Sequence, residues 1–346
     1  MHESALMRRL LVRCASTRLT VALLVLLAAG VIGGYAHEPI AAVGVTFPLA
    51  LLTLNLAAAA AIRPVFRSQA PLLVAHLALA ALVLLAGFGR LSALQARAEL
   101  TQGLAFDGQL LDVQAGPLHR PRLQQAAFTN EGFEIEYAPG LKRGRTRNAV
   151  RWTDAQGRVR RAVIGDHEPL VLAGYRFYTT PNKGYAPVFT WRTGAGDVQG
   201  AVHLPSYPVH RLRQARAWTL PDGTAVWVML KTEETVIDPD KPAAFALPRD
   251  RDVVLRVGEE RFELAPGDRI ALPGGTLIYE GLRTWMGYRV YYDPTLPWLL
   301  AASVLAALAL AVHFALKFRR QPWRSARPAS DAPAGDAQGR PVAVWP

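Results

Sequence analysis

The chain of 346 residues is long enough for one or two domains of ordinary size. A formal net charge of +12 and a pI near 10.2 are typical of nucleic-acid-binding proteins. Much of the basic excess, however, lies beside apolar segments, where Lys and Arg set membrane topology, and we therefore exclude nucleic acid as a partner. Because Cys14 is the only cysteine, the chain can form no disulfide, CxxC pair or thiolate zinc site of its own.

The N-terminal part of the chain predicts two membrane helices behind a basic cytoplasmic leader, residues 1–18. Residues 19–36 form the first apolar run, and residues 40–62 form the second. A cleaved signal peptide is the alternative interpretation of the first run, but a second spanning run follows almost at once. Asn55, inside the second run, is expected to hydrogen-bond a neighbouring helix.

Residues 70–88 predict a third membrane helix, since about twenty apolar residues at 1.5 Å rise span a bilayer core. The segment contains no Asp, Glu, Lys or Arg, but it contains His76. An ionisable side chain inside a membrane helix is costly to keep, which makes His76 a candidate functional residue. The alternative is a histidine that only hydrogen-bonds a neighbouring helix.

Residues 97–294 predict a large external β domain. Short runs rich in Val, Tyr, Trp and Phe are separated by Gly, Pro, Asp and Asn, which is the pattern of strands. We expect a sandwich or an irregular barrel, with hairpin turns at residues 154–157 and 272–275. The expected strands are 133–137, 159–164, 170–179, 188–191, 225–231, 253–257, 261–264, 276–282 and 288–292. The basic stretch 142–151 is expected to be a solvated loop, with contact to lipid headgroups or an acidic partner as the alternative.

Residues 296–316 predict a fourth membrane helix, and residues 317–346 predict a basic, disordered cytoplasmic tail. The short loops and termini that are basic belong on the cytoplasmic side. The sequence therefore predicts a multi-pass protein of the bacterial inner (plasma) membrane with both termini cytoplasmic and the β domain in the periplasm.

Three segments carry a resemblance to a known family. They are the third span with His76 and its exit Gly87-Phe88-Gly89, the segment Gly174-Tyr175-Arg176-Phe177-Tyr178 followed by Gly184, and residues 287–297 before the last helix. In this layout the chain resembles the ResB (CcsB) family of cytochrome c biogenesis proteins, part of System II. Thr295 stands where the family pattern has glycine.

The resemblance implies a subunit that moves haem across the membrane and presents haem and apocytochrome c for covalent attachment. It implies a ResC (CcsA)-type multi-span partner, apocytochrome c and a thioredoxin-like thiol reductase as partners, besides membrane lipid. The tryptophan-rich loop of the ResC-type partner is absent from this sequence. We therefore expect no enzyme in this chain by itself, but a subunit of a haem-transport and cytochrome c synthase (haem lyase) complex.

Two intramembrane histidines could bind haem iron as neutral imidazoles. The resemblance implies His76 as an axial ligand of haem b that is held transiently and shared, with the second ligand supplied by the partner. His313 is the weaker candidate. At 1.5 Å per residue, His76 lies roughly 9 Å and His313 roughly 5 Å from the cytoplasmic edge of the membrane. The two similar depths permit an internal pair of ligands. His313 could instead be an interfacial residue that reaches the headgroups.

The soluble region offers no catalytic constellation and no metal-ligand spacing. Its histidines are expected at the surface or in turns: His119, His167, His203 and His210. A second class of function therefore stays open, a non-haem membrane scaffold or sensor with a ligand-binding β domain. A haem absorption band in the purified protein separates the two classes.

Overall fold

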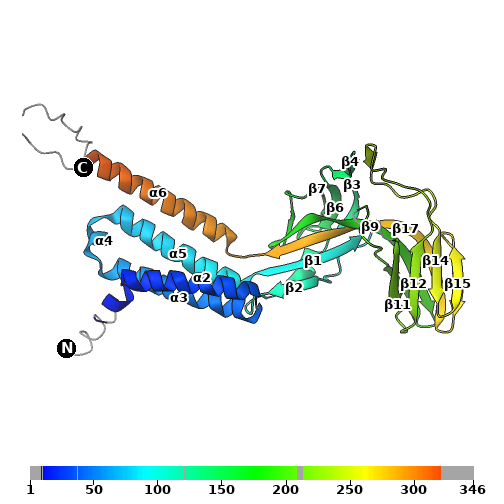
Figure 1. Cartoon of the computed structure of the whole chain (residues 1–346), viewed down its shortest axis with the longest axis horizontal. Helices are drawn as coiled ribbons and strands as arrows, with labels where there is room; N and C mark the ends of the chain where they lie inside the picture. The colour runs from blue at the N-terminus through cyan, green and yellow to red at the C-terminus, as the bar shows by residue number, and fades with distance from the viewer. Residues whose placement is uncertain (1–8, 10, 37, 121, 209–212, 321–346) are drawn as a thin grey trace, which may run out of the picture. The chain divides into compact units, whose positions relative to one another are not determined.

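The protein is described from a computed structural model, in residues 9, 11–36, 38–120, 122–208 and 213–320 (Figure 1). Four helices in this part of the chain are long and apolar enough to cross a membrane. They are α2 (Thr17–Ala36), α3 (Glu38–Ile62), α5 (Ala70–Ser92) and α6 (Leu296–Arg320), and the five-residue helix α4 (Pro64–Ser68) joins α3 to α5. Three membrane helices before a β domain and one after it confirm the predicted fold class. The predicted disordered tail lies outside the described residues.

Helices α2 and α3 pack closely because small residues and one amide line their contact. A side chain at Gly30 would collide with the backbone of Gly44 on α3, so only glycine permits this approach. Asn55 is 3% exposed and donates through Nδ2 to the carbonyl oxygens of Cys14 (2.5 Å) and Ser16 (3.2 Å). The hydroxyl of Thr20 donates to Asn55 Oδ1 at 2.8 Å. This network confirms the interhelical role predicted for Asn55.

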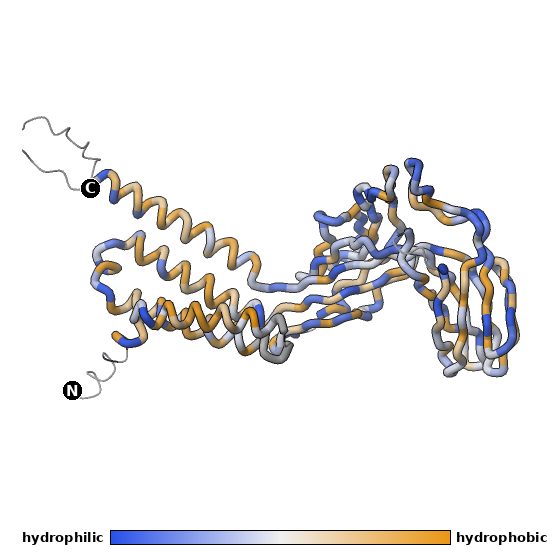
Figure 2. The backbone as a smooth tube through the Cα atoms, viewed as in Figure 1, coloured by the Kyte–Doolittle hydropathy of each residue, from blue (hydrophilic) through white to orange (hydrophobic). Residues whose placement is uncertain are grey.

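The helices expose apolar side chains where a soluble protein would expose polar ones. Hydrophobic residues dominate the four helices in Figure 2, whereas hydrophilic residues recur along the strands. On α6, Leu300 and Leu308 are 67% and 61% exposed. Such surfaces are stable in lipid, and they agree with the membrane location predicted from the apolar runs.

The β domain is a compact unit, residues 87–296, built from antiparallel sheets. The largest sheet has the order β10 (Gly196–Ala201), β9 (Tyr175–Thr193), β17 (Gly275–Tyr292), β1 (Leu94–Thr101), β2 (Leu111–Ala115), with β16 (Arg269–Leu272) on β17 and β8 (Leu170–Leu172) on β9. A second sheet has the order β11 (Ala215–Thr219), β12 (Ala225–Leu230), β14 (Val253–Val257), β15 (Glu260–Leu264). Two three-stranded sheets complete it: β13 (Ala243–Ala244), β4 (Glu136–Ala138), β5 (Lys142–Arg143), and β3 (Thr129–Glu134), β6 (Arg147–Thr153), β7 (Val159–Ile164).

Two long strands, β9 and β17, form the spine of the domain and pair along most of their length (Figure 1). The sequence predicted each of them as two separate strands. That expectation was wrong because the two strands stay paired across the predicted gaps, through register shifts between Tyr279 and Gly281 and between Met286 and Tyr288. A bulge shifts the alternation of side chains without ending the strand.

The basic stretch 142–151 is not the solvated loop that its charge predicted. Its residues form β5 and the first part of β6, and Asn148 and Val150 on β6 are fully buried. The arginines beside them, Arg147 and Arg151, lie on the opposite face of the strand. The charges therefore concealed the alternation of buried and exposed residues that is typical of a strand. The predicted hairpin turns are confirmed: residues 154–157 join β6 to β7, and residues 273–274 join β16 to β17.

Candidate functional site

His76 lies in the second turn of α5, in a segment with no other ionisable side chain before Arg90. Its half-buried ring packs on Phe66 of α4, with the ring centroids 4.6 Å apart and the planes inclined by 38°. Pro64 begins α4, and its fixed φ suits the first helical position, so this single turn brings the chain round from α3 to α5. Phe66, which is buried, thus supports one face of the imidazole.

The ring nitrogens of His76 form no hydrogen bond with any residue that the structure describes. The alternative of a histidine that only bonds a neighbouring helix therefore finds no partner in this part of the chain. A neutral imidazole of this kind has a lone pair available for a metal, and an apolar shell around it suits the axial ligation of haem. The residues present fit one axial ligand.

His313 lies on α6, where its half-buried ring contacts Phe314 of the same helix at 5.3 Å. Among the described residues, no ring contact or hydrogen bond joins His313 to His76. The structure also brings no three His, Cys, Asp or Glu side chains together as a metal site in the described ranges. The internal pair thus stays a prediction, and His76 has the better-defined surroundings.

The C-terminal end of α5 meets the turn that precedes α6. Thr295 is 2% exposed, and its backbone N–H and its hydroxyl both donate to Asp293 Oδ1, at 2.8 and 2.6 Å. A Cβ atom at Gly89 would lie 2.9 Å from the Thr295 hydroxyl, so glycine is needed on α5 at this contact. Two of the segments that carried the family resemblance are therefore neighbours in space, and the Asp293 carboxylate caps the turn by accepting both hydrogen bonds from Thr295.

A loop after β2 caps the C-terminal end of α5, where helix carbonyl groups lack partners. The Leu118 N–H donates to the Leu91 carbonyl at 2.8 Å, and His119 Nδ1 donates to the Ser92 carbonyl at 3.1 Å. Since Nδ1 must carry the proton, Nε2 of a neutral ring accepts the Tyr175 hydroxyl at 3.2 Å. His119 was predicted as a surface or turn residue; the structure makes it a connection between α5 and the start of β9.

The glycines of the remaining family-like segment, Gly174 and Gly184, also permit close packing. Gly174 has a φ of +85°, and a Cβ there would lie 3.0 Å from the ring of Tyr292. A Cβ at Gly184 would lie 2.8 Å from the indole nitrogen of Trp285. Both contacts join β9, or the turn before it, to β17, which explains why this segment carries glycine at these two positions.

His203 departs most from its predicted place at the surface, because its side chain is 17% exposed and fully engaged. Its Nδ1–H donates to Glu99 Oε2 at 2.9 Å, its Nε2 accepts the Thr101 hydroxyl at 2.9 Å, and its ring stacks on Trp285. The hydrogen bond from His203 lowers the pKa of Glu99. Thr101 is only 3% exposed, so this arrangement stabilises the sheet and presents no nucleophile to a substrate. His167 is exposed as predicted, and His210 lies outside the described residues.

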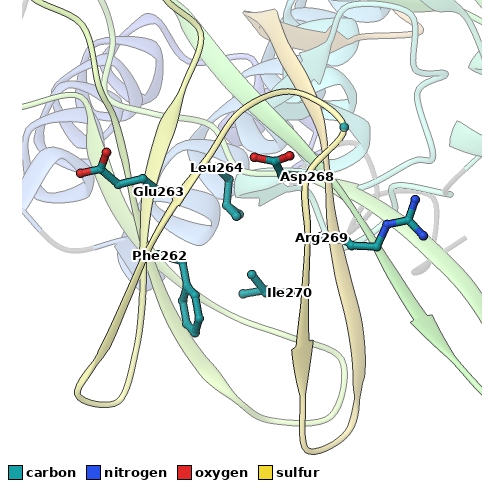
Figure 3. A pocket seen from close by; sticks show the side chains of 7 residues that line it. Phe262, Glu263, Leu264, Asp268, Arg269 and Ile270 are labelled. Carbon is teal, nitrogen blue, oxygen red and sulfur yellow. The ribbon is translucent and has the colours of Figure 1, made fainter.

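The groove in Figure 3 lies between β15 and β16 and holds no unpaired acid. Glu263 is bound by Lys231 and Arg261, both at 2.7 Å, and Asp268 accepts the Ala265 N–H at 2.8 Å. With its carboxylates already engaged, the groove offers no general acid or base. That the β domain carries no catalytic constellation stays a prediction.

The comparisons with known proteins agree with the resemblance seen in the sequence. The ResB-like family matches residues 58–339, and the chain belongs to that family. This membership supports a role in cytochrome c biogenesis. Among curated proteins, none matches the chain.

A solved structure named "Cytochrome c Heme Lyase CcmF" is similar to 86% of this chain at 15% sequence identity, with a TM-score of 0.23. The chain spans about a third of that protein's length, since 34% of it is covered. So low a TM-score adds nothing to the fold assignment.

Proposed function

We propose that this protein is a haem-handling subunit of a cytochrome c biogenesis complex that it forms with a ResC (CcsA)-type partner. The observation that carries the proposal is His76: an imidazole with free nitrogens, supported by Phe66, inside a charge-free membrane helix of a ResB-like chain. Haem is the cargo, and the complex attaches it covalently to apocytochrome c. The chain is not the synthase by itself.

His76 would hold the iron of the cargo through one ring nitrogen while its ring rests on Phe66. The second axial ligand comes from the partner, with His313 as the internal alternative. A neutral ring is needed, and the apolar helices around it disfavour the charged form. The haem is of the b type, held transiently and shared with the partner.

The proposed direction of transport requires both termini in the cytoplasm and the β domain in the periplasm. The basic residues of the loop 63–69 and of the segment after α6 support this orientation. A reporter enzyme that is active only in the periplasm should work when fused at Gly157 and fail at Ala334. Activity at Ala334 would contradict the orientation.

The β domain would present apocytochrome c to the complex, and a thioredoxin-like reductase would keep the substrate cysteines reduced. Its strands β9 and β17 pair along most of their length and offer an extended sheet on which a substrate could be held.

The test is purification of the chain together with its ResC-type partner from cells that make haem, followed by an absorption spectrum. We expect a Soret band in the complex. A complex without haem absorption, from cells that mature cytochrome c normally, would favour the alternative of a non-haem membrane scaffold or sensor.

A further inference from the structure

A basic and aromatic patch covers one face of the large sheet, on residues of β1, β9 and β17. Along β9 and β17, Tyr175, Phe177, Tyr288 and Val290 are buried. The residues between them point to the other face and stay at least partly exposed. With Arg97 of β1 they make up the Arg/Tyr patch, which consists of Arg97, Arg176, Tyr178, Arg289 and Tyr291.

The strand register places the members of the Arg/Tyr patch side by side. Arg289 lies directly opposite Tyr178 on one side and Arg97 on the other. Arg176 lies directly opposite Tyr291, and the rings of Tyr178 and Tyr291 are 6.0 Å apart. The patch therefore occupies two neighbouring rows across three strands.

Two of the three arginines of the patch have no charged partner within the described part of the chain. Arg97 pairs with Asp112, but Arg176 and Arg289 form no ion pair or hydrogen bond with a described residue. Arg97, which lies directly opposite Arg289, already has the Asp112 carboxylate. An anion from outside the chain would therefore neutralise Arg176 and Arg289.

Two members of the patch lie close in sequence to the ends of membrane helices. Arg97 follows the end of α5 by five residues, and Tyr291 precedes the start of α6 by five. At about 3.4 Å per residue, both lie within roughly 17 Å of a helix end. Arginine side chains can reach further toward the interface, where tyrosine is also enriched.

We propose that the Arg/Tyr patch binds the anionic headgroups of phospholipids in the leaflet next to the β domain. Three strands about 4.8 Å apart give an open face wider than one phosphate group, which suits several headgroups better than a single free anion. The arginines bind lipid phosphates, and the tyrosine rings lie in the interface. Lipid binding would fix the distance of the β domain from the membrane surface. This binding depends on neither haem nor a partner protein.

The proposal is tested with a fluorophore placed beside the patch. Val171 on β8 is 53% exposed and lies directly opposite Arg176, so Val171→Cys in a Cys14→Ser background gives a single labelling site. The labelled full-length chain is placed in nanodiscs of phosphatidylcholine alone or mixed with phosphatidylglycerol. Lipids that carry a spin label on the headgroup then quench the fluorophore when the patch is docked.

We expect stronger quenching when phosphatidylglycerol is present and less at about 1 M salt, where charges are screened within about 3 Å. The double variant Arg176→Gln/Arg289→Gln should lose this gain, with docking weakened roughly fivefold per arginine, since each basic residue near an anionic surface contributes about 1 kcal/mol. The matched control is Arg145→Gln/Arg269→Gln, two exposed arginines of the same domain with no described ion pair.

Three results would overturn the proposal. The first is equal quenching in the patch variant and the unsubstituted protein. The second is an equal loss in the control variant, which would indicate a general effect of net charge. The third is displacement by inorganic phosphate at matched ionic strength, which would indicate a site for a free anion. None of these outcomes bears on the haem-handling role, because the measurement contains no haem.

Discussion

His76→Ala, expressed with the ResC-type partner, should reach the membrane in normal amounts but lose bound haem and mature cytochrome c. The substitution removes the imidazole and leaves an apolar helix intact, so folding should not suffer. We expect haem occupancy to fall at least about tenfold, the factor that corresponds to 1.4 kcal/mol of binding free energy. The measurements are the Soret absorbance of the purified complex and the yield of haem-stained cytochrome c.

Added imidazole can enter the space that the variant opens beside Phe66, and it should partly restore both measured quantities. Leu77→Ala is the matched control, because Leu77 follows His76 on α5 and is 49% exposed. His313→Ala separates the two models of the second ligand: a milder loss indicates a ligand from the partner, and an equal loss indicates the internal pair. Full haem occupancy in His76→Ala would leave His76 as a packing residue on Phe66.

The membrane helices could be predicted from the sequence because each is encoded in one continuous apolar run. A lone histidine in such a run is equally visible, which is why His76 became a candidate from the sequence alone. Both signals are local, and they depend on no residue more than a helix length away. The support that His76 receives from Phe66 was not predicted, since it requires the turn made by Pro64 and α4.

The sheets were harder to predict, because their signals are short and their partners are distant. β1 pairs with β17, which lies almost two hundred residues further along the chain, so neither strand shows its neighbour in the sequence. β9 and β17 were predicted as separate fragments although they stay paired through their register shifts, and the arginines on one face of β6 concealed the buried residues on the other. Local composition carries no information about such pairing.

The roles of His119 and His203 could not be predicted for the same reason. His119 bonds Ser92 and Tyr175, which lie 27 and 56 residues away, and His203 bonds Glu99 across 104 residues. No spacing rule for metal or catalytic sites describes such contacts. The Arg/Tyr patch was hidden in a similar way, although two of its strands had been singled out by their aromatic residues and glycines.

Lys183 is a further residue whose surroundings the sequence did not reveal. It lies on β9, is fully buried, and donates through Nζ to the Pro181 carbonyl at 3.0 Å. Its Nζ is 5.5 Å from the ring centre of Tyr137, whose buried hydroxyl has no described partner. Burial lowers the pKa of Lys183 from 10.5 to about 8, with a smaller contribution from Arg143, and burial likewise raises the pKa of Tyr137 to about 12. The folded protein thus keeps an ammonium group in a poorly solvated place.

The consequence for stability follows from the direction of that shift. Between about pH 8 and pH 10.5 the unfolded chain still holds the proton that the folded chain has lost, so the free energy of unfolding should rise with pH across this window. Below pH 8 both states are protonated, and the destabilisation by the buried charge is fully present. The lowering of the Lys183 pKa from 10.5 to about 8 corresponds to a loss of about 3 kcal/mol in the free energy of unfolding at neutral pH.

Lys183→Met should therefore stabilise the β domain at pH 7 and remove the rise in stability toward pH 10. Methionine fills a similar volume without a charge, but the bond to Pro181 and the contact with Tyr137 are lost. We expect the free energy of unfolding to rise by about 2 kcal/mol in total. For a domain of this size that raises the midpoint of thermal unfolding by roughly 4–8 °C. Near-ultraviolet circular dichroism of the full chain in detergent, at pH 7 and pH 10, measures this midpoint.

Lys142→Met, at an exposed position of the neighbouring β5, is the matched control, and its midpoint should change little. A lower midpoint for Lys183→Met at pH 7 would mean that the ammonium group stabilises the folded domain.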